Sequence, residues 1–302
     1  MKNSSLLVIF GNQLFAQDRL PAPDEVRVFL AEDLGLCTYE KHHQQKIVLF
    51  LAAMRAYAGE LRDAGYDVDY VHLDPSDQRS YEEKLDQVLS EGVTELVHFE
   101  VEDRAMEQRL IDFAELRDLE RTELSSPMFT CTREDFATWN ADRASPFMQE
   151  FYKFQRRRLG ILINDNDEPE GGRWSFDADN RRKLPKNVEP PEIPWPEPDE
   201  HVREVIDLVA KTFPDHPGRA DEFHWPTTRS QARHWLDDFI AHRLRDFGPY
   251  EDAITSRSAT VFHSLLSPYL NMGLLTPDEV VEKVLATAKD APLQSVEGFV
   301  RQ

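Results

Sequence analysis

Apolar residues in the first 125 positions alternate between short runs and helically spaced sets. Residues 6–10 form an apolar run that ends at Gly11, and residues 26–31 form a second run that ends at Glu32. The same criteria predict further strands at residues 67–73, 95–99 and 123–126, and helices at residues 46–64, 80–90 and 103–118. Strands that alternate with helices are typical of a doubly wound parallel sheet. We therefore predict an α/β domain over residues 1–126.

The pattern changes between residues 127 and 200. Residues 148–159 are spaced like a helix that ends at Gly160, and a long passage rich in Pro, Asp and Asn follows as far as Pro198. Passages of this length without periodicity are usually functional or linking segments. We interpret residues 127–200 as an extended connector.

Helical spacing dominates after Asp199. We predict helices at residues 201–213, 228–243, 267–273 and 277–289, the last introduced by a Thr276 cap. Residues 295–302 begin like a helix but have no C-terminal capping signal. We therefore expect residues 201–302 to be the first part of an all-helical domain, in a fragment or a natural short form.

The net charge complicates the choice of partner. Fifty-six acidic residues against 35 basic ones give a formal charge of −21. Proteins that bind nucleic acid usually carry a basic surface. Abundant acids with few lysines also suit a high-salt cytoplasm, where self-repulsion is screened. Composition alone favours a protein that never contacts nucleic acid.

Other features indicate a cytoplasmic protein. No apolar run approaches the roughly 18 residues of a membrane-spanning helix, and the first residues are typical of a strand rather than a signal peptide. Cys37 and Cys131 lie far apart and suit a reducing compartment as structural thiols. We expect a monomer.

Residues 262–275, FHSLLSPYLNMGLL, contain the strongest candidate site. Ser267 followed by Pro268 is typical of a helix start. His263 and Ser264 lie just upstream, so short polar side chains converge on free N–H groups, an arrangement that binds phosphate. The alternative is an ordinary capped helix that binds nothing.

Metal and hydrolase sites have weaker support. His42 and His43 are adjacent, point about 100° apart on a helix and cannot chelate one ion together. Asp177 and Asp179 carry oxygens that suit Mg²⁺, but a solvated hydrogen-bonding loop explains them as well. We find no catalytic triad, P-loop or GxGxxG motif, and we name no catalytic residue.

Four further segments accompany the 262–275 segment: FGNQL at residues 10–14, AEDLGLCTYEKHHQQK at residues 31–46, GGRWSFDADNR at residues 171–181, and FGPYEDA at residues 247–253. Together these five segments resemble the photolyase/cryptochrome family, in particular its iron–sulfur bacterial branch of deoxyribodipyrimidine photolyase-related proteins. The resemblance extends from residue 6 to the last residue.

The resemblance implies two cofactor sites. FAD would be held by Tyr250, His263, Ser264, Leu265, Leu266 and Ser267, with Arg301 and Gln302 beside the flavin ring. A 6,7-dimethyl-8-ribityllumazine antenna would be held by Asn12, Gln13, Glu32, Tyr39 and His43. The alternative for this second set is capping of the strand ends without a ligand. The branch also carries a 4Fe-4S cluster, expected only beyond Gln302.

The function implied by the resemblance is blue-light repair of pyrimidine (6-4) photoproducts in damaged DNA by electron transfer from reduced FAD. A first alternative is a cryptochrome-type light sensor without repair, which suits the acidic composition. A second is an antenna-ligand-binding module without activity.

Overall fold

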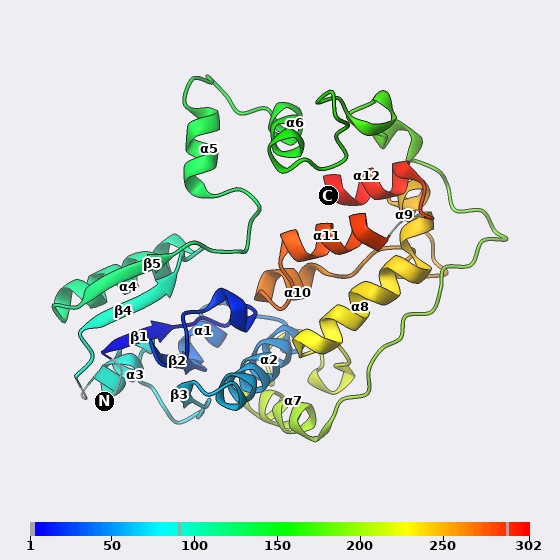
Figure 1. Ribbon diagram of the computed structural model, residues 1–302. Helices are drawn as coiled ribbons and strands as arrows, with labels where there is room; N and C mark the ends of the chain where they lie inside the picture. Colours follow the sequence, from blue (N-terminus) through cyan, green and yellow to red (C-terminus); the bar gives the residue numbers. More distant parts are fainter. Residues whose placement is uncertain (1–3, 90–91, 288–289) are drawn as a thin grey trace. The chain divides into compact units, whose positions relative to one another are not determined.

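The computed structural model describes residues 4–89, 92–287 and 290–302 (Figure 1). By internal contacts the chain forms two compact units. The first contains Met1–Met128, Trp195–Ala232 and Tyr269–Leu275, and the second contains Phe129–Pro194, Arg233–Pro268 and Thr276–Gln302. Each unit is therefore assembled from three separate segments of the chain.

The first unit is built on a five-stranded parallel sheet, which confirms the predicted fold class. Its strands are β1 (Ser5–Val8), β2 (Arg27–Ala31), β3 (Asp67–Val71), β4 (Glu95–Phe99) and β5 (Glu120–Leu124), in the spatial order β3-β2-β1-β4-β5. The strand order reverses at β1, because β2 lies on one side of it and β4 on the other. In such sheets ligands bind beyond the carboxyl ends of the strands at this point.

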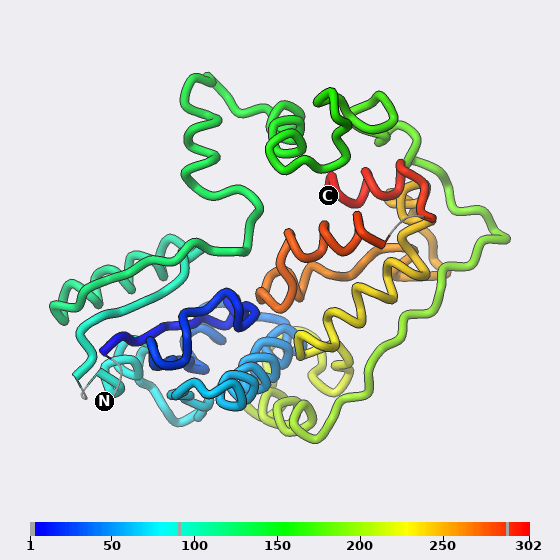
Figure 2. The backbone as a smooth tube through the Cα atoms, in the orientation of Figure 1, coloured from blue at the N-terminus to red at the C-terminus, as the bar shows by residue number. Residues whose placement is uncertain are grey.

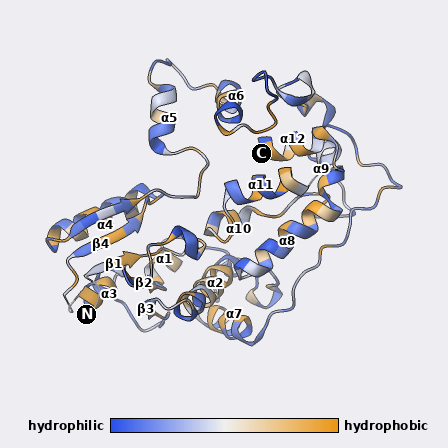
Figure 3. Cartoon of the chain, in the orientation of Figure 1, coloured by the Kyte–Doolittle hydropathy of each residue, from blue (hydrophilic) through white to orange (hydrophobic). Residues whose placement is uncertain are grey.

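Burial explains why the central strands were easy to predict and the edge strand β5 was not. Every residue of β2 is buried, and hydrophobic residues predominate in the central strands as coloured in Figure 3. The edge strand β5 has the sequence ERTEL and is mostly exposed. We predicted this strand at residues 123–126, and its position was wrong by about three residues because a polar edge strand has no apolar signal.

Four helices connect the strands from β2 to β5 along the chain. They are α1 (Leu34–Thr38), α2 (Gln44–Asp63), α3 (Tyr81–Val88) and α4 (Arg104–Leu116). Three of them match predicted helices, although residue 90, the predicted end of the second, lies outside the described residues. The short α1 was not predicted, because its five residues include Gly35 and span little more than one turn. None of the helices in the described ranges is long and apolar enough to cross a membrane.

Helix α7 (Glu200–Thr212) packs along α2 within the first unit. The ring of His201 lies 3.1 Å from the carbonyl oxygen of Ala52, and Gln44 donates a 3.1 Å hydrogen bond to the carbonyl of Phe213. The predicted start of the helical part at residue 201 therefore does not coincide with a boundary between the compact units.

The second unit contains α5 (Arg133–Asn140), α6 (Met148–Leu159), α9 (Leu244–Tyr250), α11 (Pro277–Thr287) and α12 (Leu293–Arg301). Helices α8 (Arg229–His242) and α10 (Ser267–Met272) contain the points where the chain passes from one unit to the other. The predicted end of α11 at residue 289 lies outside the described residues. Helix α9 was not predicted, because Gly248 and Pro249 lie inside it and hide its periodicity.

The predicted connector has little regular structure beyond its helices. Helix α6 ends at Gly160, as predicted, and Gly160 has the left-handed conformation. The tube in Figure 2 then follows an irregular path in which the short 3-10 turns are η3 (Glu170–Gly172) and η4 (Asp177–Asp179). Helix α5 was missed in this region, although Thr132 and Asp135 form a capping box that signals its start.

Helices α9 and α12 pack very closely in the second unit. The N–H of Gly248 donates a 3.1 Å hydrogen bond to Ser295 Oγ, which in turn donates to the carbonyl of Arg245. The rings of Phe247 and Phe299 lie 5.6 Å apart beside this contact. A hydrogen atom in place of a side chain at position 248 is what permits the close approach.

We therefore expect Gly248→Ala to destabilise the protein. The added Cβ would lie 2.7 Å from Ser295 Cα, and overpacking of this kind costs about 1–3 kcal/mol. Gly59→Ala is the matched control, because its Cβ would have no neighbour within 4 Å and alanine in a helix stabilises by about 0.5–1 kcal/mol. Urea unfolding of both variants measures the difference, and equal midpoints would contradict it.

Candidate functional site

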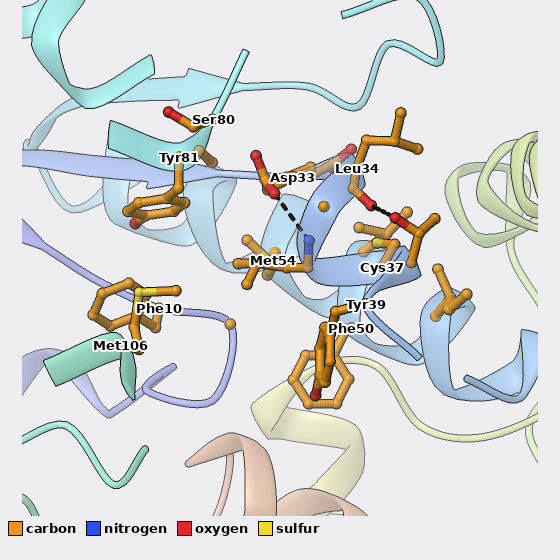
Figure 4. Close-up of a pocket in the computed structure, with 18 of the residues that line it drawn as sticks. Phe10, Asp33, Leu34, Cys37, Tyr39, Phe50, Met54, Ser80, Tyr81 and Met106 are labelled. Carbon is orange, nitrogen blue, oxygen red and sulfur yellow. Dashed lines mark hydrogen bonds between the residues drawn. The ribbon is translucent and has the colours of Figure 1, made fainter. Parts of the chain in front are cut away.

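A cavity of about 830 Å³ opens at the carboxyl edge of the sheet in the first unit (Figure 4). Residues that follow β1, β2 and β3 line it together with residues from α2 and α4. This is the edge at which the strand ends predicted a ligand site. The parallel strands thus bring segments distant in sequence to one place.

Aromatic rings and thioethers form much of the cavity wall. Phe10 and Tyr81 pack against each other with ring centroids 5.3 Å apart. Phe50, Met54 and Met106 line the same cavity, and Figure 4 labels all three among its lining residues. A wall of flat rings and polarisable sulfur suits a planar aromatic ligand.

A buried ion pair supports the wall formed by α1. Lys84 Nζ on α3 lies 2.6 Å from Asp33 Oδ2, and both side chains are almost completely buried. The other oxygen of Asp33 accepts a hydrogen bond from the N–H of Leu36 and so caps α1. One carboxylate therefore connects α1 to α3 across the cavity wall.

The structure brings three of the five predicted antenna residues to the cavity: Asn12, Glu32 and Tyr39. Gln13 does not line it, because its side chain is fully buried and donates a 2.9 Å hydrogen bond to the carbonyl of Glu100. His43 does not line it either, because its ring accepts a hydrogen bond from the N–H of Gln45 and caps α2. His42 is the histidine in the lining.

The carboxylate of Glu32 is occupied by the protein itself. Arg55 donates to both oxygens at 2.6 and 2.9 Å, and Tyr70 OH and the N–H of Leu73 each donate at 2.6 Å. Burial and the adjacent Glu32 charge together raise the pKa of Tyr70. The Glu32 side chain is fully buried, so it shapes the cavity without offering its oxygens to a ligand.

Several lining residues were missed from the sequence. Phe50 and Met54 lie four residues apart on α2 and so share one helix face. That spacing was visible, but it also fits a helix face packed in the core. Cys37 on α1 lines the cavity as well, and burial raises the pKa of its thiol to about 12.

The second candidate site is the loop of residues 261–267 in the second unit. Val261 and Leu265 have positive φ values of 48° and 58°, so the backbone turns sharply twice. Arg243 Nη1 donates a 2.8 Å hydrogen bond to the carbonyl of His263, and Trp235 Nε1 donates a 3.0 Å hydrogen bond to the carbonyl of Ser264. Neither donor was predicted from the sequence.

The predicted flavin-contact residues lie around this loop. Ser264 Oγ accepts a hydrogen bond of 3.4 Å from the N–H of Leu266, which leaves the serine hydroxyl hydrogen available to another acceptor. Ser267 is the first residue of α10. Tyr250 stacks on Phe262 with ring centroids 5.5 Å apart, and the His263 ring packs against Phe247.

Arg301 is engaged in ion pairs in the second unit. Its guanidinium lies 2.6 Å from Glu251 Oε1 and 3.4 Å from Asp177 Oδ1. Burial raises the pKa of Glu251, and the charge of Arg301 opposes that shift. Gln302 follows α12 and is exposed.

In the part of the chain that the structure describes, no group of three or more His, Cys, Asp or Glu side chains could hold a metal ion.

The two cysteines should differ in reactivity. Only the thiolate attacks an alkylating reagent, and burial raises the pKa of both thiols, that of Cys37 to about 12. We expect iodoacetamide at pH 8 to modify Cys131 about tenfold faster or more, because Cys37 is the more deeply buried thiol and stays protonated. Peptide mass spectrometry follows each site, with Cys37→Ser and Cys131→Ser as controls. Equal rates would show that the wall around Cys37 opens freely.

Comparison with known proteins identifies the family. The family model described as deoxyribodipyrimidine photo-lyase-related protein matches residues 7–225. A curated (6-4) photolyase from Agrobacterium fabrum is 33% identical over 308 residues, an alignment that covers 99% of this chain and 60% of the relative. The uncharacterized protein R852 of Acanthamoeba polyphaga mimivirus is 29% identical over 200 residues, which cover 62% of this chain and 98% of that protein.

A solved structure has a similar fold. The crystal structure of a bacterial class III photolyase from Agrobacterium tumefaciens matches with a TM-score of 0.55 at 18% identity, and the match covers all of this chain and 57% of that one. The chain therefore spans about three fifths of the Agrobacterium proteins that it matches. Because the family model covers well over half of the sequence, the chain belongs to the deoxyribodipyrimidine photolyase-related family.

Proposed function

We propose that this chain binds the cofactors of an FAD-dependent, blue-light-driven DNA photolyase that repairs pyrimidine (6-4) photoproducts. Family membership is the observation that carries the proposal. Two features of the chain support it independently. One is the cavity with an aromatic and thioether wall, and the other is the tightly turned loop that contains Ser264 and Leu265.

The loop suits the diphosphate of FAD. The carbonyls of His263 and Ser264 point toward donors of the protein, so they do not repel an anion. The backbone N–H groups of the loop and the hydroxyls of Ser264 and Ser267 would hold the phosphates, with Leu265, Leu266 and Tyr250 beside them. When bound, reduced FAD would supply the excited electron for repair. Arg301 is held by Glu251 and Asp177, so its proposed place beside the flavin ring rests on the family resemblance alone.

The cavity of the first unit suits an antenna chromophore such as 6,7-dimethyl-8-ribityllumazine. Phe50 and Tyr39 would cover a flat heterocycle, and the amide of Asn12 would read its polar edge. Glu32 would act indirectly, because its carboxylate is consumed by Arg55 and Tyr70.

Damaged DNA is the proposed partner. A formal charge of −21 opposes association with a polyanion, and the opposition acts over longer distances at low salt. An acidic photolyase of this kind is expected to work in a high-salt cytoplasm. The two cysteines of the chain are free thiols, as is usual in a reducing compartment.

The same acidic charge favours a second candidate, a blue-light sensor that binds FAD without repairing DNA. A light sensor does not need to bind the phosphate backbone of DNA, so a negatively charged surface does not oppose its function. A third candidate is a module that binds only the antenna ligand.

Repair under blue light distinguishes these candidates. We expect the native protein that carries this chain, reconstituted with reduced FAD, to restore a (6-4) photoproduct in an oligonucleotide under illumination and not in the dark. Chromatography of the oligonucleotide measures repair. Flavin photoreduction without repair would favour the sensor, and a protein without flavin absorbance would favour the module.

Substitutions in the cavity test the antenna site. Tyr39 is 69% exposed, so Tyr39→Ala should hardly change stability but should weaken lumazine binding about tenfold, equivalent to about 1.4 kcal/mol. His43→Ala is the matched control, because loss of a helix cap costs about 1 kcal/mol of stability without touching the cavity. Fluorescence titration with 6,7-dimethyl-8-ribityllumazine measures affinity. A larger loss of affinity in His43→Ala would contradict the assignment of the cavity.

A further inference from the structure

Arg243 is an unusual residue for its position. Its side chain is only 1% exposed, and it lies between α8 and α9 with its guanidinium over the rings of Trp235 and Phe239, at 5.7 and 5.5 Å. One end of the guanidinium binds Asp238 Oδ2 at 2.9 Å, and the other donates to the carbonyl of His263. A buried arginine with this set of contacts is fixed in orientation.

Trp235 provides a second attachment to the same loop. It lies two turns before Arg243 along the chain, and its indole N–H donates to the carbonyl of Ser264, the residue after His263. Two consecutive carbonyls of the loop are thus held by two side chains that also pack against each other. The orientation of two consecutive peptide planes is therefore set from outside the loop.

Fixing the carbonyls also fixes the N–H groups. In a trans peptide the C=O and N–H bonds of one plane point in opposite directions. The N–H of Ser264 must therefore point away from Arg243, and the N–H of Leu265 must point away from Trp235. Across the described residues, no acceptor contacts either N–H. Successive N–H groups beside a left-handed residue, here Leu265, form the kind of concave backbone nest that binds anions.

The role of Arg243 is geometric rather than one of net charge. Asp238 balances the guanidinium charge and also accepts a hydrogen bond from His242 Nδ1 at 3.0 Å. The pair therefore adds little net positive charge near the loop. What Arg243 contributes is the direction in which the backbone donors of Ser264 and Leu265 face.

We propose that Arg243 and Trp235 are positioning residues that aim the N–H groups of Ser264 and Leu265 at the diphosphate of a flavin dinucleotide. This inference rests on the proposed function for the identity of the ligand. It assigns the selectivity for a dinucleotide over a phosphate-free flavin to two side chains that need not touch the ligand.

The ligand test compares two flavins on the native protein that carries this chain. We expect Arg243→Met to weaken FAD binding about ten- to hundredfold and to change riboflavin binding by no more than about threefold, because only FAD carries the diphosphate. Trp235→Phe keeps an aromatic ring under Arg243 and removes the indole N–H donor, so it should lower the same FAD-to-riboflavin ratio about tenfold. It also serves as the second variant if Arg243→Met does not fold.

Arg156→Met is the matched control in the same unit. Arg156 is 2% exposed and donates to the carbonyls of Ile161, Leu162 and Trp174, so its loss removes an equivalent set of contacts from another loop. We expect it to reduce stability to a similar extent while leaving the FAD-to-riboflavin ratio unchanged. A general loss of stability is thereby separated from a change in ligand selectivity.

Hydrogen exchange tests the positioning itself without a ligand. We expect Arg243→Met and Trp235→Phe to speed amide exchange of His263 and Leu266 about tenfold relative to α6, because the N–H groups of these two residues are hydrogen-bonded to Thr260 and Ser264 within the loop. Arg156→Met should leave the exchange of both amides unchanged. A wild-type protein that does not prefer FAD over riboflavin would overturn the proposed ligand, whereas exchange would still decide the positioning role. A wild-type FAD preference and exchange rate retained in both variants would overturn the inference.

Discussion

A buried carboxylate must have its charge compensated, and the compensation of Glu32 organises the carboxyl edge of the sheet. Its two oxygens receive four donors from α2, from β3 and from the backbone that follows β3. Those contacts hold the end of β2 in place, and α1 begins only two residues later. The cavity wall thus depends on a charge that would be very unfavourable without its partners.

Each unit uses polar residues in the same way. In the first, Gln13 and Glu32 lie at strand ends where a ligand would be expected, yet their side chains hold the backbone and neighbouring elements. In the second, Arg243 and Trp235 hold carbonyls of a loop that carries other donors. Polar side chains near a candidate site therefore divide into those that can meet a ligand and those that shape the surface it meets.

The sequence predicted the parallel sheet because its central strands are apolar and end at glycine or acidic residues. Most helices were predicted from the helical spacing of their apolar residues and from their capping residues. The sequence could not predict the directions of the Gln13 and His43 side chains, because a polar side chain that faces a ligand and one that holds the backbone look the same in a sequence. The partners of Glu32 and the loop contact of Arg243 were also beyond prediction, since they join residues about 20 or more positions apart through burial.

The attachment of residues 263 and 264 through their carbonyls has an evolutionary consequence. A carbonyl is present whatever the side chain, so histidine or another residue can occupy position 263 while the loop keeps its shape. Substitution should therefore be tolerated at position 263 and resisted at Trp235 and Arg243, which contribute side-chain atoms. Searches for distant relatives would gain sensitivity by weighting Trp235 in α8 and Arg243 directly after it, together with the loop itself.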